Sequence, residues 1–433
     1  MSVFTLPTSS NLPSPNFNTD RLTYEEIRPR SSTLSGAVQL EWSSSANRYF
    51  IPGDSYMVVD FEFQKSNGAG NAWENITGNA NYVSAVPAFN AGANFFSQLT
   101  LQANNVLVGT ISNPAQQAAV HARTEVSKDY ASTTGSVEML GSATERKENT
   151  VSIQTAEGVD RKTFSVVLRP NFGMLRGGKS WPGLRWALTC NIHPSYTSRI
   201  LTSLGAATEH PITTGAAPAT MHDFRTQITG VRYYAAHASP VESVPIPRQV
   251  IAPLYELSSS SQQLPNGLVA GTVSTLQFTV PPSSYKLYLT CQQADAGESP
   301  IGQAKEVSEF RGGIGISDLQ ISYAGVSLPQ VGYSKLADEP ERPFADYVRS
   351  TLAAQDGKAA LDSVQTWRES PIAVFRFARP PQDASTECTV RISFSGTLGV
   401  AMNVGLYAAY QAVAVIDYDG AGLAENVTYS YAA

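Results

Sequence analysis

Apolar and polar residues alternate with a period of two along much of the chain. Val38, Leu40 and Trp42, for example, are separated by polar residues, and the same alternation recurs at residues 59–63, 164–168, 184–192, 276–280, 285–291 and 388–394. Because successive side chains of a strand point to opposite faces, this pattern predicts half-buried strands. Loops rich in Gly, Pro, Ser and Asn separate these runs. The predicted fold is therefore all-β and built from antiparallel sandwiches or barrels.

Three segments show helical spacing instead. The first begins at Asn113-Pro114, where Asn is a favourable N-cap and Pro a favourable first residue. Its apolar face consists of Ala115, Ala118, Ala119, Ala122 and Val126. A second helix is predicted to begin at Pro343, with Phe344, Tyr347, Val348 and Leu352 on one face, and a short third helix is predicted over residues 359–367.

Two stretches that lie about half a chain apart align without gaps. Residues 97–108 read SQLTLQANNVLV and residues 317–328 read SDLQISYAGVSL, with identities at Ser97/Ser317, Leu99/Leu319 and Val106/Val326. Each stretch predicts a strand, a tight turn (104–105 and 324–325) and a second strand, followed by a helix that begins at proline. This internal repeat indicates two copies of one β-rich domain in tandem.

The repeat and the proline-rich segments together predict the domain boundaries. Residues 1–20, which contain Pro7, Pro13 and Pro15, are expected to form an extended N-terminal arm. Residues 21–238 are expected to form the first domain and residues 248–433 the second. Residues 239–247 carry three prolines and no apolar periodicity, so they are predicted to be the linker.

The composition adds a constraint on the surface. Charged residues make up only 15% of the 433 residues, against about 25% in a typical soluble protein. A free monomer keeps itself soluble with a charged surface, so we expect much of this surface to face other protein. The formal net charge of −6 argues against a chain that coats nucleic acid by charge.

The cysteines and the hydropathy indicate the compartment. Cys190, Cys291 and Cys388 lie in alternating apolar runs, so we expect buried thiols, no disulfide framework and a reducing compartment. The start of the chain lacks the basic and apolar regions of a signal peptide. The longest nearly apolar stretch, residues 404–416, is too short for a membrane span of about 20 residues, so no transmembrane segment is expected.

One segment matches a phosphate-binding motif. Residues 173–180 read GMLRGGKS, which fits the P-loop pattern GxxxxGKS, and the apolar run that ends at Asp417 could be read as its magnesium partner. A P-loop must open a helix, whereas Trp181-Pro182-Gly183 and an alternating strand follow here. We therefore interpret the segment as a loop between strands.

A pair of acids is the other candidate for catalysis. Asp60 and Glu62 lie two apart on a predicted strand, so both carboxylates share one face, as paired carboxylates do on the jelly-roll sheet of some glycosidases. The laminarinase-type pattern ExDxE needs a third acid, and Val58 stands in its place. Solvent-facing acids opposite a buried apolar face are the favoured interpretation.

Metal-ligand patterns are lacking in the sequence. His121, His193, His210, His222 and His237 show no ligand spacing, and Asp417-Tyr-Asp419-Gly420 lacks the third acid and the closing Glu of a calcium loop. The basic residues Arg176, Lys179 and Arg185 cluster only locally. The sequence thus predicts no catalytic, cofactor-binding or metal-binding residues and no enzymatic activity.

Two short stretches of the sequence resemble a known family. Residues 94–108, NFFSQLTLQANNVLV, resemble the stretch LFSQVxVxLNxxLV of virophage and polinton-like virus major capsid proteins. Residues 316–329, ISDLQISYAGVSLP, are similar to that family's IxxLxVxYGGxxxP. The chain departs from the family at Ser112-Asn-Pro-Ala, where the family has an aromatic YPY motif. The family belongs to the double jelly-roll lineage that includes adenovirus hexon.

The resemblance implies an architecture and a role. It implies two tandem antiparallel jelly-roll sandwiches, residues 21–238 and 248–433, with a few short helices in loops. It further implies a homotrimer with a pseudo-hexagonal outline, whose capsomers contact one another and tile an icosahedral shell around a DNA genome. Such a protein is made inside the host cell and located in the virion. Its partners would be itself and a penton or minor capsid protein, without sequence-specific nucleic acid binding and without cofactors.

Two other classes of protein fit a β-rich chain. A β-sandwich carbohydrate-binding or carbohydrate-active protein would need a cleft with a carboxylate pair, for which Asp60 with Glu62 is the candidate. A trimeric adhesin or spike would be expected to show a fibrous shaft repeat, which the sequence lacks. The two similar halves favour the shell protein.

Overall fold

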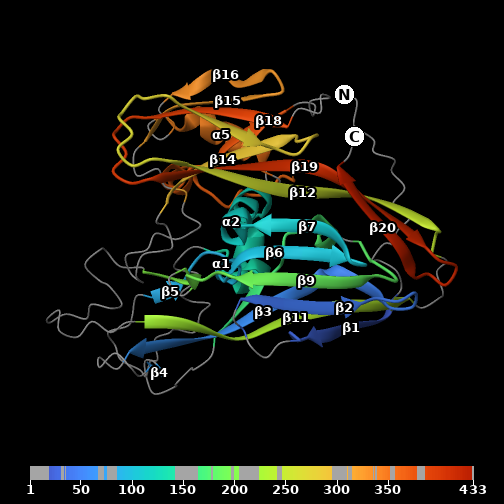
Figure 1. Cartoon of the computed structure of the whole chain (residues 1–433). Helices are drawn as coiled ribbons and strands as arrows, with labels where there is room; N and C mark the ends of the chain where they lie inside the picture. The colour runs from blue at the N-terminus through green and yellow to red at the C-terminus, as the bar shows by residue number, and fades with distance from the viewer. Residues whose placement is uncertain are drawn as a thin grey trace.

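The computed structural model describes residues 19–30, 34, 36–66, 73–75, 85–141, 164–176, 179–196, 199–203, 224–240, 246–294, 310, 315–334, 336, 339–351, 356–377 and 386–431. Residues 1–18 of the predicted arm and residues 241–245 of the predicted linker lie outside this part of the chain. Figure 1 shows that strands dominate both halves, with short helices between them.

The described residues of the first half of the chain form two large antiparallel sheets and one two-stranded sheet. One has the strand order β1-β11-β3-β4, with β8 paired to β3, and the other has the order β2-β9-β6-β7. The strands are β1 (Thr19–Ile27), β2 (Ala37–Ser43), β3 (Tyr49–Ser66), β4 (Trp73–Asn75), β6 (Phe96–Ala103), β7 (Val106–Ser112), β8 (Phe164–Leu168), β9 (Arg185–Ile192) and β11 (Phe224–Pro240), while β5 (Ala85–Pro87) pairs with β10 (Leu201–Ser203). Alternate side chains such as Leu40, Val59 and Leu101 are buried in one core, as the period-two pattern predicted.

The second half repeats this arrangement. One sheet has the order β12-β19-β14-β17, with β20 paired to β19, and the other has the order β13-β18-β15-β16. The strands are β12 (Gln249–Leu264), β13 (Ser274–Thr279), β14 (Lys286–Gln293), β15 (Ile316–Tyr323), β16 (Val326–Ser334), β17 (Ala373–Arg376), β18 (Glu387–Phe394), β19 (Met402–Tyr418) and β20 (Ala424–Tyr431).

The two halves share one topology. In chain order, β1, β2, β3, β6, β7, β8, β9 and β11 of the first half correspond to β12, β13, β14, β15, β16, β17, β18 and β19 of the second. In both halves the first, eighth, third and sixth of these strands form one sheet, and the second, seventh, fourth and fifth form the other. This order is that of a jelly roll. The chain is therefore all-β, with two jelly rolls in tandem, as predicted.

The aligned repeat occupies equivalent positions. Its two copies lie on β6 and β7 and on β15 and β16, in the hairpins that the sequence predicted. Asn104 and Asn105 have φ values of 48° and 65°, and Ala324 and Gly325 have values of 50° and 76°. Two successive positive φ values define the type I′ hairpin turn, whose twist matches that of the flanking strands. Asn and Gly accept this conformation readily.

Two long strands belong to both cores. β12 and β19 pair in continuous register from Gln249↔Asp417 to Leu264↔Met402. Val250 and Ile416 at one end of this pair are buried with the first-half core, whereas Leu264 at the other end is buried with the second-half core. In Figure 1 these strands run along the boundary between the lower, blue-to-green roll and the upper, yellow-to-red roll. The two jelly rolls are therefore joined through a shared sheet.

The helices differ from the predictions in their bounds. Helix α2 (Pro114–Glu125) begins where predicted, but Asn113 precedes it with a φ of 54° and makes no side-chain cap. Helix α5 (Glu341–Ser350) begins before the predicted Pro343, because proline is tolerated throughout the first turn. The predicted helix 359–367 is wrong in its start, because the capping box of Ser363 fixes the N-terminus of α7 (Val364–Glu369). Among the described residues, the other short helices are α1 (Ala91–Asn94), α3 (Lys128–Ser132), η2 (Thr134–Glu138) and η3 (Gly173–Leu175).

Strand β14 corrects the prediction of a half-buried strand at residues 285–291. Nearly every residue of β14 is buried, on both faces of the sheet. Tyr288 donates a hydrogen bond to Glu125 of α2 at 3.1 Å, and the Lys286 ammonium donates one to the carbonyl oxygen of Ser350 in α5 at 2.9 Å. Helices α2 and α5 therefore cover the face of β14 that the alternation alone would leave in water.

Candidate functional site

The P-loop-like segment lies between β8 and β9, as the interpretation of a loop predicted. Gly173 begins the one-turn helix η3, and its N–H donates a hydrogen bond to Glu256 Oε1 at 2.9 Å. Lys179 Nζ donates a hydrogen bond to the carbonyl oxygen of Pro253 at 2.5 Å. Trp181 then forms an isolated antiparallel β-bridge with Phe50, so an extended segment follows the motif. The amide and the lysine that would hold a phosphate in a P-loop instead attach the first jelly roll to β12 of the second.

Asp60, one of the two candidate carboxylates, forms an ion pair with Arg232 of β11. Arg232 Nη2 lies 2.8 Å and 2.6 Å from the two carboxylate oxygens of Asp60, and the hydroxyl of Ser165 donates a further hydrogen bond to Asp60 at 2.5 Å. Glu62 lies farther along β3, opposite Gln227 of β11. These contacts already engage both oxygens of the Asp60 carboxylate, whereas a catalytic carboxylate must face its substrate. Asp60 therefore acts in cross-strand pairing.

The histidines lie apart from one another. His121 is on α2, His193 follows β9, and His237 is on β11, while His210 and His222 lie outside the described residues. Burial lowers the pKa of His193 and of His237 to about 4. Within the described ranges, no group of three or more His, Cys, Asp or Glu side chains could hold a metal ion.

The remaining candidate residues from the sequence lie in a polar turn or are buried. Asp419 Oδ1 accepts hydrogen bonds from the backbone N–H groups of Ala421 and Leu423 at 2.8 Å and 2.7 Å, so the predicted polar turn is confirmed. All three cysteines are free and buried, as predicted. Burial raises the pKa of the Cys291 and Cys388 thiols to about 12. In the part of the chain described above, no helix is both long enough and apolar enough to cross a membrane.

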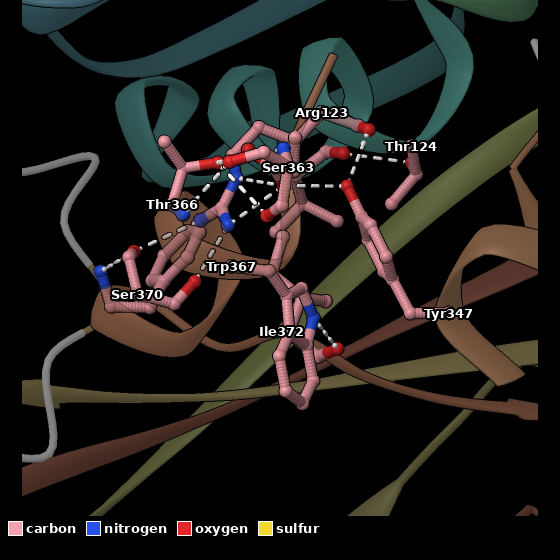
Figure 2. Close-up of polar contacts among 11 residues, drawn as sticks. Arg123, Thr124, Tyr347, Ser363, Thr366, Trp367, Ser370 and Ile372 are labelled. Carbon is pink, nitrogen blue, oxygen red and sulfur yellow. Dashed lines mark hydrogen bonds and ion pairs between the residues drawn. The ribbon is translucent and has the colours of Figure 1, made fainter. Parts of the chain in front are cut away.

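A buried polar cluster joins the two jelly rolls. This seam cluster consists of Arg123 from α2 and of Tyr347, Asp362, Trp367 and Ser370 from the second half. Figure 2 labels Arg123, Tyr347, Trp367 and Ser370. Arg123 pairs with Asp362 at 2.8 Å, and the two side chains are only 7% and 9% exposed. Arg123 also donates to the hydroxyl and the carbonyl oxygen of Ser370 at 2.9 Å and 2.6 Å. The Tyr347 hydroxyl lies 2.7 Å from the Arg123 carbonyl oxygen and 2.6 Å from Asp362 Oδ2.

Apolar packing surrounds the seam cluster. Ala119 and Val120 of α2 are fully buried in the second-half core, although they belong to the first half of the chain. Trp367 is also fully buried, and its indole N–H donates to the carbonyl oxygen of Ile372 at 3.0 Å. Gln117 of α2 donates to the carbonyl oxygen of Leu257 at 2.7 Å. Helix α2 thus contributes side chains to the core of the second roll, and Figure 1 shows it between the two rolls.

Sequence reasoning missed the seam cluster, although one signal was present. Arg123 follows Ala119 by four residues, so it lies on the side of the predicted helix that carries the alanine stripe. A charged residue in an apolar stripe is buried only with partners. The sequence could therefore have indicated a buried ion pair, but not its partner, because Asp362 lies in the other half of the chain.

In each jelly roll, a strand at the end of one sheet carries an exposed apolar side chain. β7 and β16 end their sheets, and they occupy equivalent positions in the two rolls. Leu107 on β7 is 54% exposed, and Val331 on β16 is 72% exposed. Edge strands with large apolar side chains are sites where another chain can pair or pack. The structure therefore combines a buried polar seam with exposed apolar side chains on β7 and on the edge strand β16.

Comparison with known proteins identifies the fold. No protein-family model matches the chain, and no curated protein matches it by sequence. Among solved structures, a chain of the Sputnik virophage matches with a TM-score of 0.65 at 14% identity, over 100% of this chain and 91% of that chain. The mavirus major capsid protein matches with a TM-score of 0.60 at 13% identity, over 100% and 96% of the two chains. The Faustovirus major capsid protein matches with a TM-score of 0.51 at 9% identity, over 96% and 93%.

These similarities define the class of fold. The neighbours match over nearly their whole lengths, so both jelly rolls and their mutual arrangement contribute to the likeness. The chain has the double jelly-roll fold that the mavirus and Faustovirus major capsid proteins also have.

Proposed function

We propose that the chain is a viral major capsid protein with a structural and non-enzymatic role in the virion. The observation that carries the proposal is the match of the entire chain, with both jelly rolls in place, to a chain of the Sputnik virophage and to the mavirus major capsid protein. A fold alone does not define a function. The low share of charged residues in the sequence and the ion pair that occupies Asp60 support a shell protein over a carbohydrate-active enzyme.

The proposed assembly unit is a homotrimer. Three chains with two jelly rolls each would place six similar domains around one axis, which gives a capsomer with a pseudo-hexagonal outline. We divide the chain for this purpose into an arm (1–20), a first roll (21–238), a linker (239–247) and a second roll (248–433). The capsomers would contact one another in an icosahedral shell around a DNA genome, with a penton or minor capsid protein as a further partner.

The physical support for self-association comes from the surface. Obligate interfaces bury more than about 2,000 Å² and are rich in apolar side chains. The exposed edge of β16, with Val331 and Val326, offers such side chains on a strand that can no longer pair within its own sheet. Charged residues form only 15% of the sequence, so large areas can be covered at a small desolvation cost.

The test is the assembly state of the purified chain. Light scattering is expected to give the mass of a trimer that persists on dilution, and electron micrographs are expected to show pseudo-hexagonal particles or shells. A Val331→Asp variant is expected to weaken the association, because it places a charge on the β16 edge. The matched control is Val364→Asp, which places the same charge at the exposed start of α7. A monomer at all concentrations, without capsomers in micrographs, would refute the proposal.

A further inference from the structure

Strand β12 carries a buried acid where it passes the first jelly roll. Glu256 is only 7% exposed, and its Oε1 accepts the hydrogen bond from the Gly173 N–H of η3 at 2.9 Å. A Cβ atom at Gly173 would lie 2.6 Å from the same oxygen, so the carboxyl group packs directly against the backbone of the first roll. Glycine permits so close an approach. The carboxyl group therefore lies in the contact between the two rolls, where water has little access to it.

Glu256 has no cation as a direct partner. Within the described part of the chain, it takes part in none of the ion pairs. Arg176, three residues after Gly173, lies near enough to favour the charged form of the acid, but its buried Nε and Nη2 atoms have no hydrogen-bond acceptor among the described residues. A buried carboxylate is strongly disfavoured unless a cation and hydrogen bonds replace its lost hydration. An acid in this position is therefore expected to keep its proton.

The second jelly roll surrounds Glu256 with neutral groups. Tyr410 of β19 lies opposite Glu256 in the register of β12 and β19, and the Tyr429 hydroxyl of β20 forms a hydrogen bond with the acid. Burial raises the pKa of both tyrosines, so both hydroxyls stay neutral. Lys179 of the first roll also reaches β12, but its Nζ donates to the carbonyl oxygen of Pro253 at 2.5 Å. These groups supply hydrogen bonds to the junction without a charge that balances a carboxylate.

Helix α2 presents two further titratable groups to Arg176. Burial and the Arg176 charge hold the pKa of His121 well below its usual value, so this imidazole is neutral near pH 7. Burial lowers the pKa of Arg176, whereas Glu256 and Glu125 favour its charge. Glu125 also lies 4.0 Å from Lys286 of β14. Arg176 therefore divides its attraction between two acids, and Glu256 receives only part of it.

Burial outweighs the groups that favour the charged form of Glu256. It raises the pKa of this acid from 4.5 to about 7, although Arg176, the Gly173 N–H and the Tyr429 hydroxyl act in the opposite direction. Between these two values the folded chain binds one more proton here than the unfolded chain does. The free energy of unfolding that Glu256 contributes is therefore largest at acid pH, and it falls as the pH rises from 4.5 to 7.

We propose that Glu256 is a pH-sensitive switch at the junction of the two jelly rolls, where the protonated acid holds η3 against β12 and the ionised acid weakens this contact. The neutral carboxyl group fits a contact that excludes water. The carboxylate is hydrated only if η3 moves away from β12, so its formation favours the open contact. The proposal concerns the single chain, and it does not depend on how the chain assembles.

The test compares the unaltered chain with Glu256→Gln by urea-induced unfolding between pH 5 and pH 8. Glutamine has the shape of the protonated acid and keeps an acceptor for the Gly173 N–H, but it cannot ionise. The two proteins are expected to have similar stability at pH 5. Relative to the variant, the folding equilibrium constant of the unaltered chain is expected to fall roughly five- to tenfold per pH unit up to pH 7. The matched control is Glu387→Gln at the exposed start of β18, which is expected to show no such trend.

Hydrogen exchange follows the contact itself. After correction for the intrinsic effect of pH on exchange, the backbone N–H groups of residues 173–176 are expected to exchange faster above pH 7 in the unaltered chain. In Glu256→Gln the corrected rates are expected to stay constant. Equal corrected rates in the two proteins at every pH would mean that the acid does not control the contact between η3 and β12, and would overturn the proposal.

The unfolding experiment also decides the proposal. A difference in stability between Glu256→Gln and the unaltered chain that grows with pH, and that the Glu387→Gln control lacks, would support it. A difference that stays constant from pH 5 to pH 8 would overturn it, because Glu256 would then not change its charge in the folded chain. If Glu256→Gln does not fold, Arg176→Gln gives a second test. Loss of this positive charge is expected to move the transition of Glu256 to higher pH, and a transition at the same pH would overturn the proposal.

Discussion

Replacing Arg123 by methionine would remove the cation of the seam cluster and keep a long, flexible apolar side chain in its place. The variant leaves Asp362 as a buried carboxylate whose remaining close partner is the Tyr347 hydroxyl at 2.6 Å. It also removes both hydrogen bonds to Ser370. A buried charge without its partner favours unfolding, because the unfolded chain hydrates that charge fully.

The size of the effect follows from the burial of the pair. Arg123 and Asp362 are 7% and 9% exposed, so solvent screens their interaction little. Removal of one partner from such a pair costs about 3–5 kcal/mol of the free energy of unfolding. The double variant Arg123→Met with Asp362→Leu is expected to recover a large part of this loss, because no charge is then left alone in the seam.

The assay is urea-induced unfolding followed by tryptophan fluorescence, with Trp367 of the seam cluster as one of the reporters. The control is Arg28→Met, which removes an arginine that is 76% exposed and pairs with Glu26 on the surface. That control is expected to leave the unfolding midpoint nearly unchanged. If Arg123→Met loses less than about 1 kcal/mol, or no more than the control, the seam cluster does not stabilise the junction of the rolls.

Three further predictions concern other parts of the chain. Gly183→Ala is expected to lower the Tm by an amount equivalent to about 2 kcal/mol or more, because φ is +60° and the new methyl group would clash with the carbonyl oxygen of Gly422; an unchanged Tm would contradict this close approach. His237 is buried beside Arg48 and Glu25 with a pKa of about 4, below the unfolded value of about 6.5, so the unfolded chain binds more protons between these values and stability falls as the pH drops from 6.5 to 4. In the His237→Gln variant, the free energy of unfolding is expected to change less between pH 6.5 and pH 4 than in the unaltered chain. The same pH dependence in both proteins would show that other groups cause the acid sensitivity. The three buried cysteines are expected to resist a thiol reagent in the native protein and to react completely in urea; rapid reaction of any one of them in the folded chain would contradict its burial.

The local alternation of apolar and polar residues was sufficient to predict most of the strands. The alternation at Val38, Leu40 and Trp42 led directly to β2, and these three side chains are buried as predicted. The repeat located equivalent hairpins because Asn104-Asn105 and Ala324-Gly325 both adopt the turn that a two-residue connection requires. These features depend on neighbouring residues, so a single sequence contains the information for them.

Features that depend on distant residues were not predictable in this way. The second buried face of β14 is covered by α2, whose residues lie in the other half of the chain. The partner of Arg123 is likewise separated from it by more than half of the sequence, and no local pattern identifies it. β12 and β19 contribute side chains to both cores, but their sequences show only the ordinary alternation of apolar and polar residues. This alternation is the same whichever roll covers the strand.

The shared sheet has a consequence for the order in which the protein matures on the ribosome. Val427 of β20 and Ile416 of β19 complete the core of the first roll, and Asn104 of that roll donates a hydrogen bond to the carbonyl oxygen of Ala424 at 2.7 Å. Synthesis proceeds from the N-terminus, so the first roll emerges long before these residues exist. During that interval its sheet carries an uncovered apolar surface. The first roll therefore completes its core only when the last strands of the chain arrive.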